Sequence, residues 1–352
     1  MAAELPTVRW GIIATGLISS WFVKDLMVER TDKRANHIIK AVGSSSQQKG
    51  TEFVQKHLSA ASPIPVIYGS YEEVYNDPNV DVVYIGTPHA FHKQNCLDAI
   101  KHGKHVLCEK AFTINSAEAR EVFEAAKEKG VFVMEAMWTR FFPLTRKLLT
   151  LLHSEKVIGD VRRVFCDFAM DQKIASLGPE SRLKNPALGA GSLLDIGIYS
   201  LTWALLCLDT GLGEQAEKPK IAAMQTLIDE IDTTSSALLL YPGRQGVVTC
   251  STLVKGRSPF CRIEGSEGSI EIEGFTSCPQ AFTIHKGDND TKKYEFEKPG
   301  MGFFWEADAV ALDITAGKTQ DNIMPWSETV RVLEIMDEIR RQGGAKFPQD
   351  AA

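Results

Sequence analysis

The amino-acid sequence predicts an α/β protein of two domains, the first built on a parallel sheet and the second on a largely antiparallel sheet. From Val8 to about Ala136, short apolar runs alternate with helical stretches, which is typical of βαβ units. Beyond Phe141 the hydrophobic period changes to two, which is typical of antiparallel strands. Because 352 residues suffice for two cores, we expect one domain over residues 1–136 and a second over residues 137–352.

The N-terminal half contains segments that can form a parallel sheet. The first strand is predicted over Val8–Ile13 and the second over Ile38–Gly43. The segment Val80–Gly86 is a nearly continuous apolar run, as expected of a strand that is covered on both faces. A helix over Ser116–Lys129 and a strand over Val131–Met134 complete this half.

The C-terminal half consists of strands and three predicted helices. The helices lie near Leu144–His153, Ser192–Leu208 and Ser327–Gln342, and the middle one is apolar enough to be buried. The period-two segments are Val161–Phe168, Ile221–Ile228, Ser235–Tyr241, Gly246–Leu253, Phe260–Glu264 and Ser269–Ile272. Their clustering predicts a largely antiparallel sheet.

Composition excludes several classes of protein. The net charge of −6 is modest and no lysine or arginine run forms a stripe, so nucleic acid is not an expected partner. The N-terminus lacks the pattern of a signal peptide, and no apolar run approaches the roughly 18 residues that span a bilayer. Seven scattered cysteines and eight unclustered histidines favour reduced thiols and no metal site. We therefore expect a cytoplasmic protein without a membrane partner.

A loop of small residues, Gly11–Ser19, lies where the first strand turns into a helix. Small residues there let backbone N–H groups approach a pyrophosphate at the helix N-terminus, which favours a dinucleotide site. The match to the G-x-G-x-x-G fingerprint is imperfect, because Ala14, Gly16 and Ser19 hold its positions, and an ordinary tight turn is the alternative. The expected cofactor contacts are Gly11, Ala14, Thr15, Gly16, Leu17 and Ile18.

The segment after the second strand, Gly43–Lys49, favours NADP over NAD. An NAD enzyme usually places a carboxylate here on the ribose 2′-hydroxyl, and this segment contains none. Its hydroxyl groups and ammonium group can instead donate hydrogen bonds to a 2′-phosphate. The expected contacts are Ser44, Ser45, Ser46 and Lys49, and the alternative is a polar surface turn.

The loop that follows Gly86 is expected to face the nicotinamide ribose, because ligands bind at the carboxyl ends of parallel strands. The candidate contacts are Thr87, Pro88, His89 and His92. The alternative for the two histidines is a capping or packing role. Glu109 and Lys110 end the strand that begins near His105. They are therefore also expected at the edge of the sheet where the cofactor binds.

The chain resembles the glucose-fructose oxidoreductase/inositol dehydrogenase family, Gfo/Idh/MocA, over nearly its whole length. The resemblance rests on the glycine loop, Thr87-Pro88-His89, Glu109-Lys110, and Asp195 followed four residues later by Tyr199. Two further stretches, residues 134–143 and 194–199, resemble the dimeric dihydrodiol dehydrogenases and, more closely, the fungal NADP-dependent D-xylose 1-dehydrogenases.

The resemblance implies a Rossmann domain, followed by an open-faced α/β domain whose exposed sheet forms a homodimer. It also implies that Lys110 and Tyr199 are the catalytic pair. Two departures are visible: family members commonly carry proline where Ala111 stands, and many carry histidine where Tyr199 stands. Alanine in place of proline affects the geometry of the turn at Lys110. Tyrosine in place of histidine narrows the part of the family that this chain resembles.

The catalytic pair has a physical rationale. Oxidation of a sugar hemiacetal needs a hydride acceptor and a base for the hydroxyl proton. A free tyrosine titrates near about 10, so an ammonium group from Lys110 beside the phenol of Tyr199 would lower its pKa. Asp195 lies one helical turn earlier and is expected to bind a substrate hydroxyl or to orient Lys110. The alternative for Tyr199 is a buried aromatic role.

Trp138, Arg140 and Phe141 are candidates for substrate contacts. Sugars present apolar C–H faces and dense polar edges, which aromatic rings and a guanidinium group can bind. The alternative is that these residues pack the junction between the domains.

The function expected from the sequence is NADP-dependent oxidation of D-xylose and similar aldoses at the anomeric carbon, giving the aldonolactone. One alternative within the same enzyme class is oxidation of trans-dihydrodiols or reduction of dicarbonyls. A second alternative is a non-catalytic regulator that senses NADP, since a fold alone does not establish catalysis.

Overall fold

The computed structural model describes residues 4–287 and 290–351. The chain divides into two compact units. The first comprises Met1–Thr113, Ala117–Phe141 and Lys298–Trp326, and the second comprises Ile114–Ser116, Phe142–Glu297 and Ser327–Ala352.

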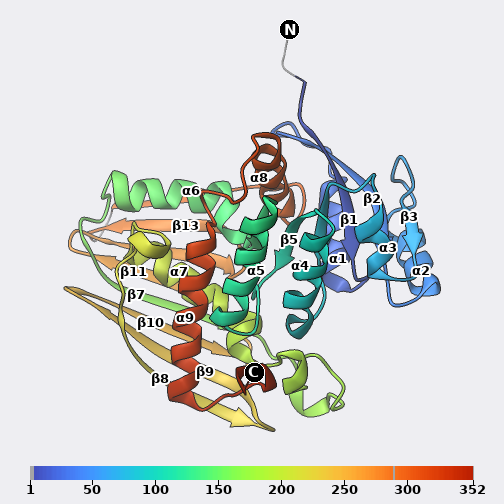
Figure 1. The fold of residues 1–352 in the computed structure, drawn as a ribbon. Helices are drawn as coiled ribbons and strands as arrows, with labels where there is room; N and C mark the ends of the chain where they lie inside the picture. Colours follow the sequence, from blue (N-terminus) through green and yellow to red (C-terminus); the bar gives the residue numbers. More distant parts are fainter. Residues whose placement is uncertain (1–3, 288–289, 352) are drawn as a thin grey trace. The chain divides into compact units, whose positions relative to one another are not determined.

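The first unit is built on a six-stranded parallel sheet of order β3-β2-β1-β4-β5-β6 (Figure 1). The strands are β1 Thr7–Ile13, β2 Asn36–Gly43, β3 Val66–Tyr68, β4 Val82–Ile85, β5 His105–Glu109 and β6 Val133–Ala136. The helices are α1 Leu17–Leu26, α2 Gln47–His57, α3 Tyr71–Asn76, α4 His92–Lys101, α5 Ser116–Lys129 and α8 Phe303–Thr315. The strand order reverses between β1 and β4, so the crevice that binds ligands in such sheets lies beside the carboxyl end of β1. The expected parallel sheet is confirmed.

The domain division differs from the single boundary expected at residue 136. The first unit extends to Phe141, and the chain returns to it at Lys298. The cause is α8, which packs on α1 and whose N-terminus is bound by a buried carboxylate. Asp25 accepts hydrogen bonds from the backbone of Met301, Gly302 and Phe303 at 2.6–3.0 Å. Because these residues are so far apart in the chain, no local sequence pattern predicts their contact.

The second unit contains an eight-stranded sheet of order β14-β13-β12-β11-β7-β10-β9-β8 (Figure 1). Among its described strands, β7 and β10 pair in parallel, and the other neighbours pair antiparallel. The strands are β7 Val161–Ala169, β8 Lys220–Ile228, β9 Ile231–Tyr241, β10 Arg244–Ser251, β11 Cys261–Gly265, β12 Ser269–Phe275, β13 Cys278–Lys286 and β14 Asp290–Glu295. The helices are α6 Pro143–Leu149, α7 Ile198–Leu208 and α9 Trp326–Gly343.

Two strands of this sheet, β13 and β14, were not predicted. Consecutive residues of β13, Ala281–Ile284, are buried, so the strand shows no alternation. The edge strand β14 is polar throughout and mostly exposed, so it shows no apolar face. Both strands therefore lack the period-two signal by which the others were found.

Helix α7 covers one face of the sheet, where it packs against β7 and β10. Alternate residues of β7, among them Val164 and Phe168, are buried on that side. The helical stretch within Pro186–Leu208 is, by length and composition alone, apolar enough to cross a membrane. No stretch of this kind was expected from the sequence. Its most apolar window is fully buried inside the structure, as in the core helix of a globular protein.

A buried carboxyl pair in the first unit predicts a pH-dependent stability. Burial, followed by a hydrogen bond with Asp313, raises the pKa of Asp321 to about 6. A raised folded-state pKa stabilises the fold below the unfolded value of about 4, and this contribution is lost as the pH rises through about 6. Replacing the carboxyl group by an amide removes the charge that is costly at neutral pH.

We therefore expect Asp321→Asn to raise the free energy of unfolding at pH 8 by about 1–3 kcal/mol relative to the wild type. At pH 4.5 the two proteins should unfold alike in urea, because the wild-type carboxyl group is then protonated. Equal differences at both pH values would contradict this account.

Candidate active site

The turn between β1 and α1 fits an anion. The backbone of Ala14 is left-handed, with φ +75°, and its N–H donates to the carbonyl oxygen of Gly43 at 3.1 Å. Gly16 begins α1 without a side-chain cap, and the first turn contains no acidic residue. A Cβ atom added to Gly16 would meet only the carbonyl oxygen of Gly86, at 4.0 Å. The free N–H groups and the open space beside them suit a pyrophosphate.

Gly11 has a packing role that was not expected. It lies within β1, where an added Cβ would approach Val74 to 2.6 Å and Val80 to 2.9 Å. Its missing side chain therefore makes room for packing, and the expected contact with the cofactor stays a prediction. Ile18 is half-buried, whereas Leu17 is 66% exposed at the start of α1.

The polar segment after β2 has a buried part, which contacts the glycine loop, and an exposed part at the start of α2. Ser44 is buried, and its hydroxyl lies 3.2 Å from that of Thr15, which joins this segment to the glycine loop. Ser46 caps α2 by accepting a hydrogen bond from the N–H of Lys49 at 3.4 Å. The exposed ammonium group of Lys49 donates to the exposed hydroxyl of Ser45 at 3.2 Å. The first turn of α2 contains no acidic residue, so this helix N-terminus suits a phosphate.

The lysine motif ends β5. Glu109 is buried, and its carboxylate accepts hydrogen bonds from the hydroxyl of Tyr84 at 2.6 Å and from the backbone N–H of Lys110 at 3.3 Å. The Lys110 side chain is half-buried, and the peptide bond to Ala111 is cis. Glu109 therefore anchors the backbone from which Lys110 extends.

The loop after β4 contains two buried histidines. His89 and His92 meet edge to face, with ring centroids 5.6 Å apart. The His92 ring lies 2.8 Å from the carbonyl oxygen of Thr87 and 2.9 Å from that of Ala111. Both ring nitrogens are thus occupied by backbone, which favours the packing role for His92. Pro88 is half-buried at the start of this turn.

The three expected substrate contacts lie in a 3₁₀ turn, Trp138–Phe141, of the first unit. Trp138, Arg140 and Phe141 are all buried. The indole ring of Trp138 stacks on Phe303 at 4.0 Å between centroids. These observations favour packing over a floor for a sugar.

Asp195 and Tyr199 lie on one helical stretch of the second unit. Asp195 belongs to a π-helical turn, Leu193–Gly197, that continues into α7, and Tyr199 is in the first turn of α7. The expected helical placement is confirmed. Tyr199 is 6% exposed and meets Phe168 edge to face at 5.7 Å.

The sequence reasoning missed the residues that hold this helical stretch. The carboxylate of Asp195 accepts from the side-chain amide of Gln172 at 2.7 Å and from Arg182 at 3.3 Å. Buried Asp232 accepts from the hydroxyl of Ser192 at 2.6 Å and from the N–H of Leu193 at 2.7 Å, at the N-terminal end of the helix. Burial raises the pKa of Asp232. The sequence signal for this role was weak: an acidic residue, Asp232, directly follows the apolar Ile231.

The structure brings the cofactor candidates together at the carboxyl ends of β1, β2, β4 and β5. Asp195 and Tyr199 lie in the second unit, whereas Lys110 lies in the first, so the pairing of Lys110 with Tyr199 stays a prediction. Over residues 4–287 and 290–351, no group of three or more His, Cys, Asp or Glu side chains is arranged to hold a metal ion.

Two family models match the chain. The model described as "Oxidoreductase family, NAD-binding Rossmann fold" matches residues 8–137, and the one described as "GFO/IDH/MocA C-terminal domain" matches residues 146–271.

Curated relatives cover almost the whole chain. The D-xylose 1-dehydrogenase (NADP(+)) of Hypocrea jecorina is 35% identical, over 99% of this chain and 95% of the relative. The trans-1,2-dihydrobenzene-1,2-diol dehydrogenase of Sus scrofa is 36% identical, over 97% of this chain and 98% of the relative. Among solved structures, the aldose-aldose oxidoreductase of Caulobacter crescentus, in complex with glycerol, has a TM-score of 0.80 at 23% identity. That match covers 96% of this chain and 98% of the other, and it shows a shared fold.

Proposed function

Because the chain belongs to the Gfo/Idh/MocA family of oxidoreductases, we propose that it oxidises D-xylose and similar aldoses with NADP, giving the aldonolactone. The observation that carries the substrate assignment is the likeness, along the whole chain, to an enzyme named for that reaction. Two observations support NADP. Lys49 and Ser45 are hydrogen-bonded at the N-terminus of α2, and the first turn of this helix contains no acidic residue.

The residues of the first unit have binding roles in this proposal. The N-terminus of α1, opened by Gly16, binds the pyrophosphate, and Ser45 and Lys49 bind the 2′-phosphate. Bound NADP⁺ supplies the hydride acceptor. Glu109 fixes the backbone at Lys110 through the hydrogen bond between its carboxylate and the Lys110 N–H.

The proton chemistry belongs to Lys110, Tyr199 and Asp195. Tyr199 as phenolate takes the proton from the anomeric hydroxyl while the C–H hydride leaves from the same carbon. The Lys110 ammonium group lowers the pKa of the phenol, since an opposite charge a few ångströms away favours the ionised form. Asp195, held by Gln172 and Arg182, binds a further substrate hydroxyl.

A substrate panel tests this proposal. Initial rates should be measured with D-xylose, other pentoses, hexoses and a benzene trans-dihydrodiol, each with NADP and with NAD. We expect the highest kcat/KM for D-xylose with NADP. A higher value for the dihydrodiol would establish the second candidate, which the 36% identity to the porcine dihydrodiol dehydrogenase favours. Binding of NADPH without turnover of any substrate would indicate a regulator.

The cofactor assignment gives a separate prediction at Ser45. Ser45→Asp places a carboxylate next to the Lys49 ammonium group, where it repels a 2′-phosphate and can accept from a ribose hydroxyl. We expect KM for NADP to rise about 10–100-fold while KM for NAD stays level or falls. Ser45→Asn is the matched neutral control, and an unchanged NADP/NAD ratio in the Asp variant would contradict the assignment.

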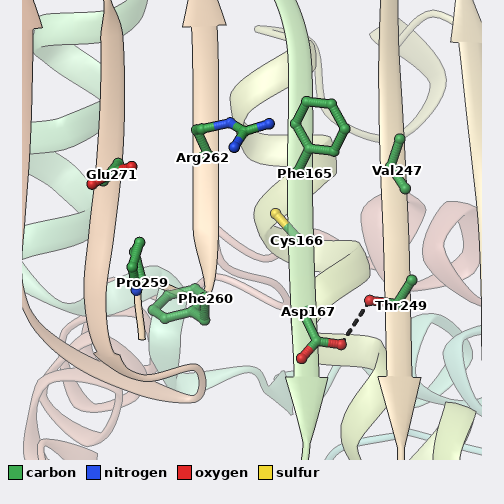
Figure 2. A pocket seen from close by; sticks show the side chains of 9 residues that line it. All are labelled: Phe165, Cys166, Asp167, Val247, Thr249, Pro259, Phe260, Arg262 and Glu271. Carbon is green, nitrogen blue, oxygen red and sulfur yellow. Dashed lines mark hydrogen bonds between the residues drawn. The ribbon is translucent and has the colours of Figure 1, made fainter. Parts of the chain in front are cut away.

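We also propose that the protein is a homodimer through the face of the eight-stranded sheet opposite α7. The exposed apolar side chains Met224, Leu238 and Leu240 lie on that face, with exposed fractions of 79%, 41% and 51%. A hollow of about 300 Å³ lies on the neighbouring strands. Figure 2 shows Phe165 and Arg262 among the side chains that line it. Apolar area beside charges of both signs suits a face that meets its own copy across a two-fold axis.

The dimer proposal is tested by Leu238→Arg. We expect this variant to sediment as a monomer at concentrations where the wild type is a dimer, because a charge would be buried in the apolar part of the interface. Val66→Arg, which changes an exposed apolar residue of the first unit, is the control. A Leu238→Arg protein that stays dimeric would contradict the proposed face.

A further inference from the structure

His92 lies between two loops at the ligand edge of the parallel sheet and contacts the backbone of both. Its side chain is 1% exposed. Nδ1 lies 2.9 Å from the carbonyl oxygen of Ala111, and Nε2 lies 2.8 Å from that of Thr87. Thr87 follows β4, and Ala111 follows Lys110 at the end of β5. One ring therefore connects the loop after β4 to the backbone next to Lys110.

The surroundings of the ring are fixed. Next to it on α4, Asn95 donates to the carbonyl oxygen of Phe91 at 2.8 Å and accepts from the hydroxyl of Tyr75 at 3.0 Å. Burial lowers the pKa of His92, and the charge of Lys110 lowers it further, against the raising effect of the backbone carbonyl oxygens. A neutral ring has one N–H, so each tautomer donates to one of the two carbonyl groups.

We propose that His92 is a positioning residue for Lys110, acting through the backbone of Ala111. In the tautomer with Nδ1–H, the ring donates to the Ala111 carbonyl oxygen and ties the Ala111–Phe112 peptide to the start of α4, directly after the loop that follows β4. This hydrogen bond limits the positions that the Lys110 ammonium group, one residue earlier, can take. This inference rests on the proposed function, because the position of Lys110 matters to turnover only if Lys110 serves the chemistry. The proposal assigns the pyrophosphate to the glycine loop and the 2′-phosphate to the segment after β2, whereas the loop after β4 is expected to face the nicotinamide ribose.

Three variants separate positioning from general stability. His92→Phe keeps the ring volume and removes both nitrogens, whereas His92→Gln keeps an N–H donor. His153→Phe is the control, because His153 is half-buried and its Nε2 lies 2.7 Å from a backbone carbonyl oxygen, that of Leu206 in the second unit. For each protein, kcat and the KM for NADP are measured with D-xylose, together with amide hydrogen exchange of residues 109–114.

We expect His92→Phe to lower kcat about 10–100-fold with little change in the KM for NADP, since a displacement of about 1 Å can cost that much in rate. His92→Gln should recover most of the loss, and His153→Phe should keep the wild-type kcat. Exchange in residues 109–114 should become faster only in His92→Phe.

A His92→Phe enzyme with wild-type kcat would overturn the inference, as would a kcat loss shared by His153→Phe. If the wild type oxidises no aldose and no dihydrodiol, the proposed function fails, and hydrogen exchange still decides the role of His92. Faster exchange confined to residues 109–114 in His92→Phe then supports the tie between the loops. Unchanged exchange overturns it.

Discussion

Lys110→Met should turn over D-xylose at least about a thousandfold more slowly than the wild type while binding NADPH almost as tightly. Methionine keeps most of the length of the side chain and removes the ammonium charge. In the proposed pair only that charge favours the phenolate of Tyr199, so little phenolate should form at neutral pH without it. The loss therefore falls on hydride transfer, because proton and hydride leave the same carbon.

Single-turnover kinetics with excess enzyme measure this step directly, and NADPH fluorescence titration measures affinity for the cofactor. Lys101→Met, which changes an exposed lysine on α4 of the same unit, is the control. Tyr199→Phe should lose a similar factor. The double variant should be little worse than either single one, because the proposal makes the two residues one catalytic unit. A Lys110→Met enzyme with unaltered turnover would defeat the assignment.

Gly16→Asp should bind NADPH at least about a hundredfold more weakly and yet unfold at a higher temperature than the wild type. The two effects have separate causes. A carboxylate at the N-terminus of α1 occupies the space proposed for the pyrophosphate and repels it. The same carboxylate is a favourable N-cap for a helix that has no side-chain cap, and Gly16 has the open space to accept it.

Gly16→Asn separates charge from size in this experiment. Asparagine is also a good N-cap and has nearly the same shape, so it should raise the unfolding temperature to a similar extent. Its effect on NADPH affinity should be clearly smaller than that of aspartate. If both variants bound NADPH like the wild type, the pyrophosphate would not lie at the N-terminus of α1.

The outline of the fold was predictable because local patterns determine it. Apolar runs alternating with helices predicted the parallel sheet, and the period-two segments from Val161 to Ile272 predicted most of the second sheet. The return of α8 to the first unit was not predictable, since it depends on Asp25 binding a backbone nearly 280 residues away. Strand β14 was missed because an exposed polar edge strand has no apolar periodicity.

The candidate site was predictable at the level of motifs and less so at the level of roles. The glycine loop leads into the N-terminus of α1, and the Ser44–Lys49 segment contains the N-cap of α2, whereas their contacts with a cofactor stay a prediction. Gly11 and His92 were assigned to the cofactor by their place in motifs, whereas the structure shows the side chains that crowd Gly11 and the two backbone carbonyl groups beside His92. Partners such as Gln172 and Arg182 come from a loop whose sequence has no periodic signal, so only the folded chain reveals them.

The most direct test of the proposed chemistry is a crystal structure of the complex with NADP and a sugar, and in it the distance between Nζ of Lys110 and the phenol oxygen of Tyr199. We predict a separation of about 4–6 Å or less, with both groups beside the nicotinamide ring, since an ammonium group shifts the pKa of a phenol substantially only at such range. Side chains farther apart than about 10 Å, the Debye length at about 0.1 M salt, or a Lys110 ammonium group turned to bulk water, would contradict the catalytic pair.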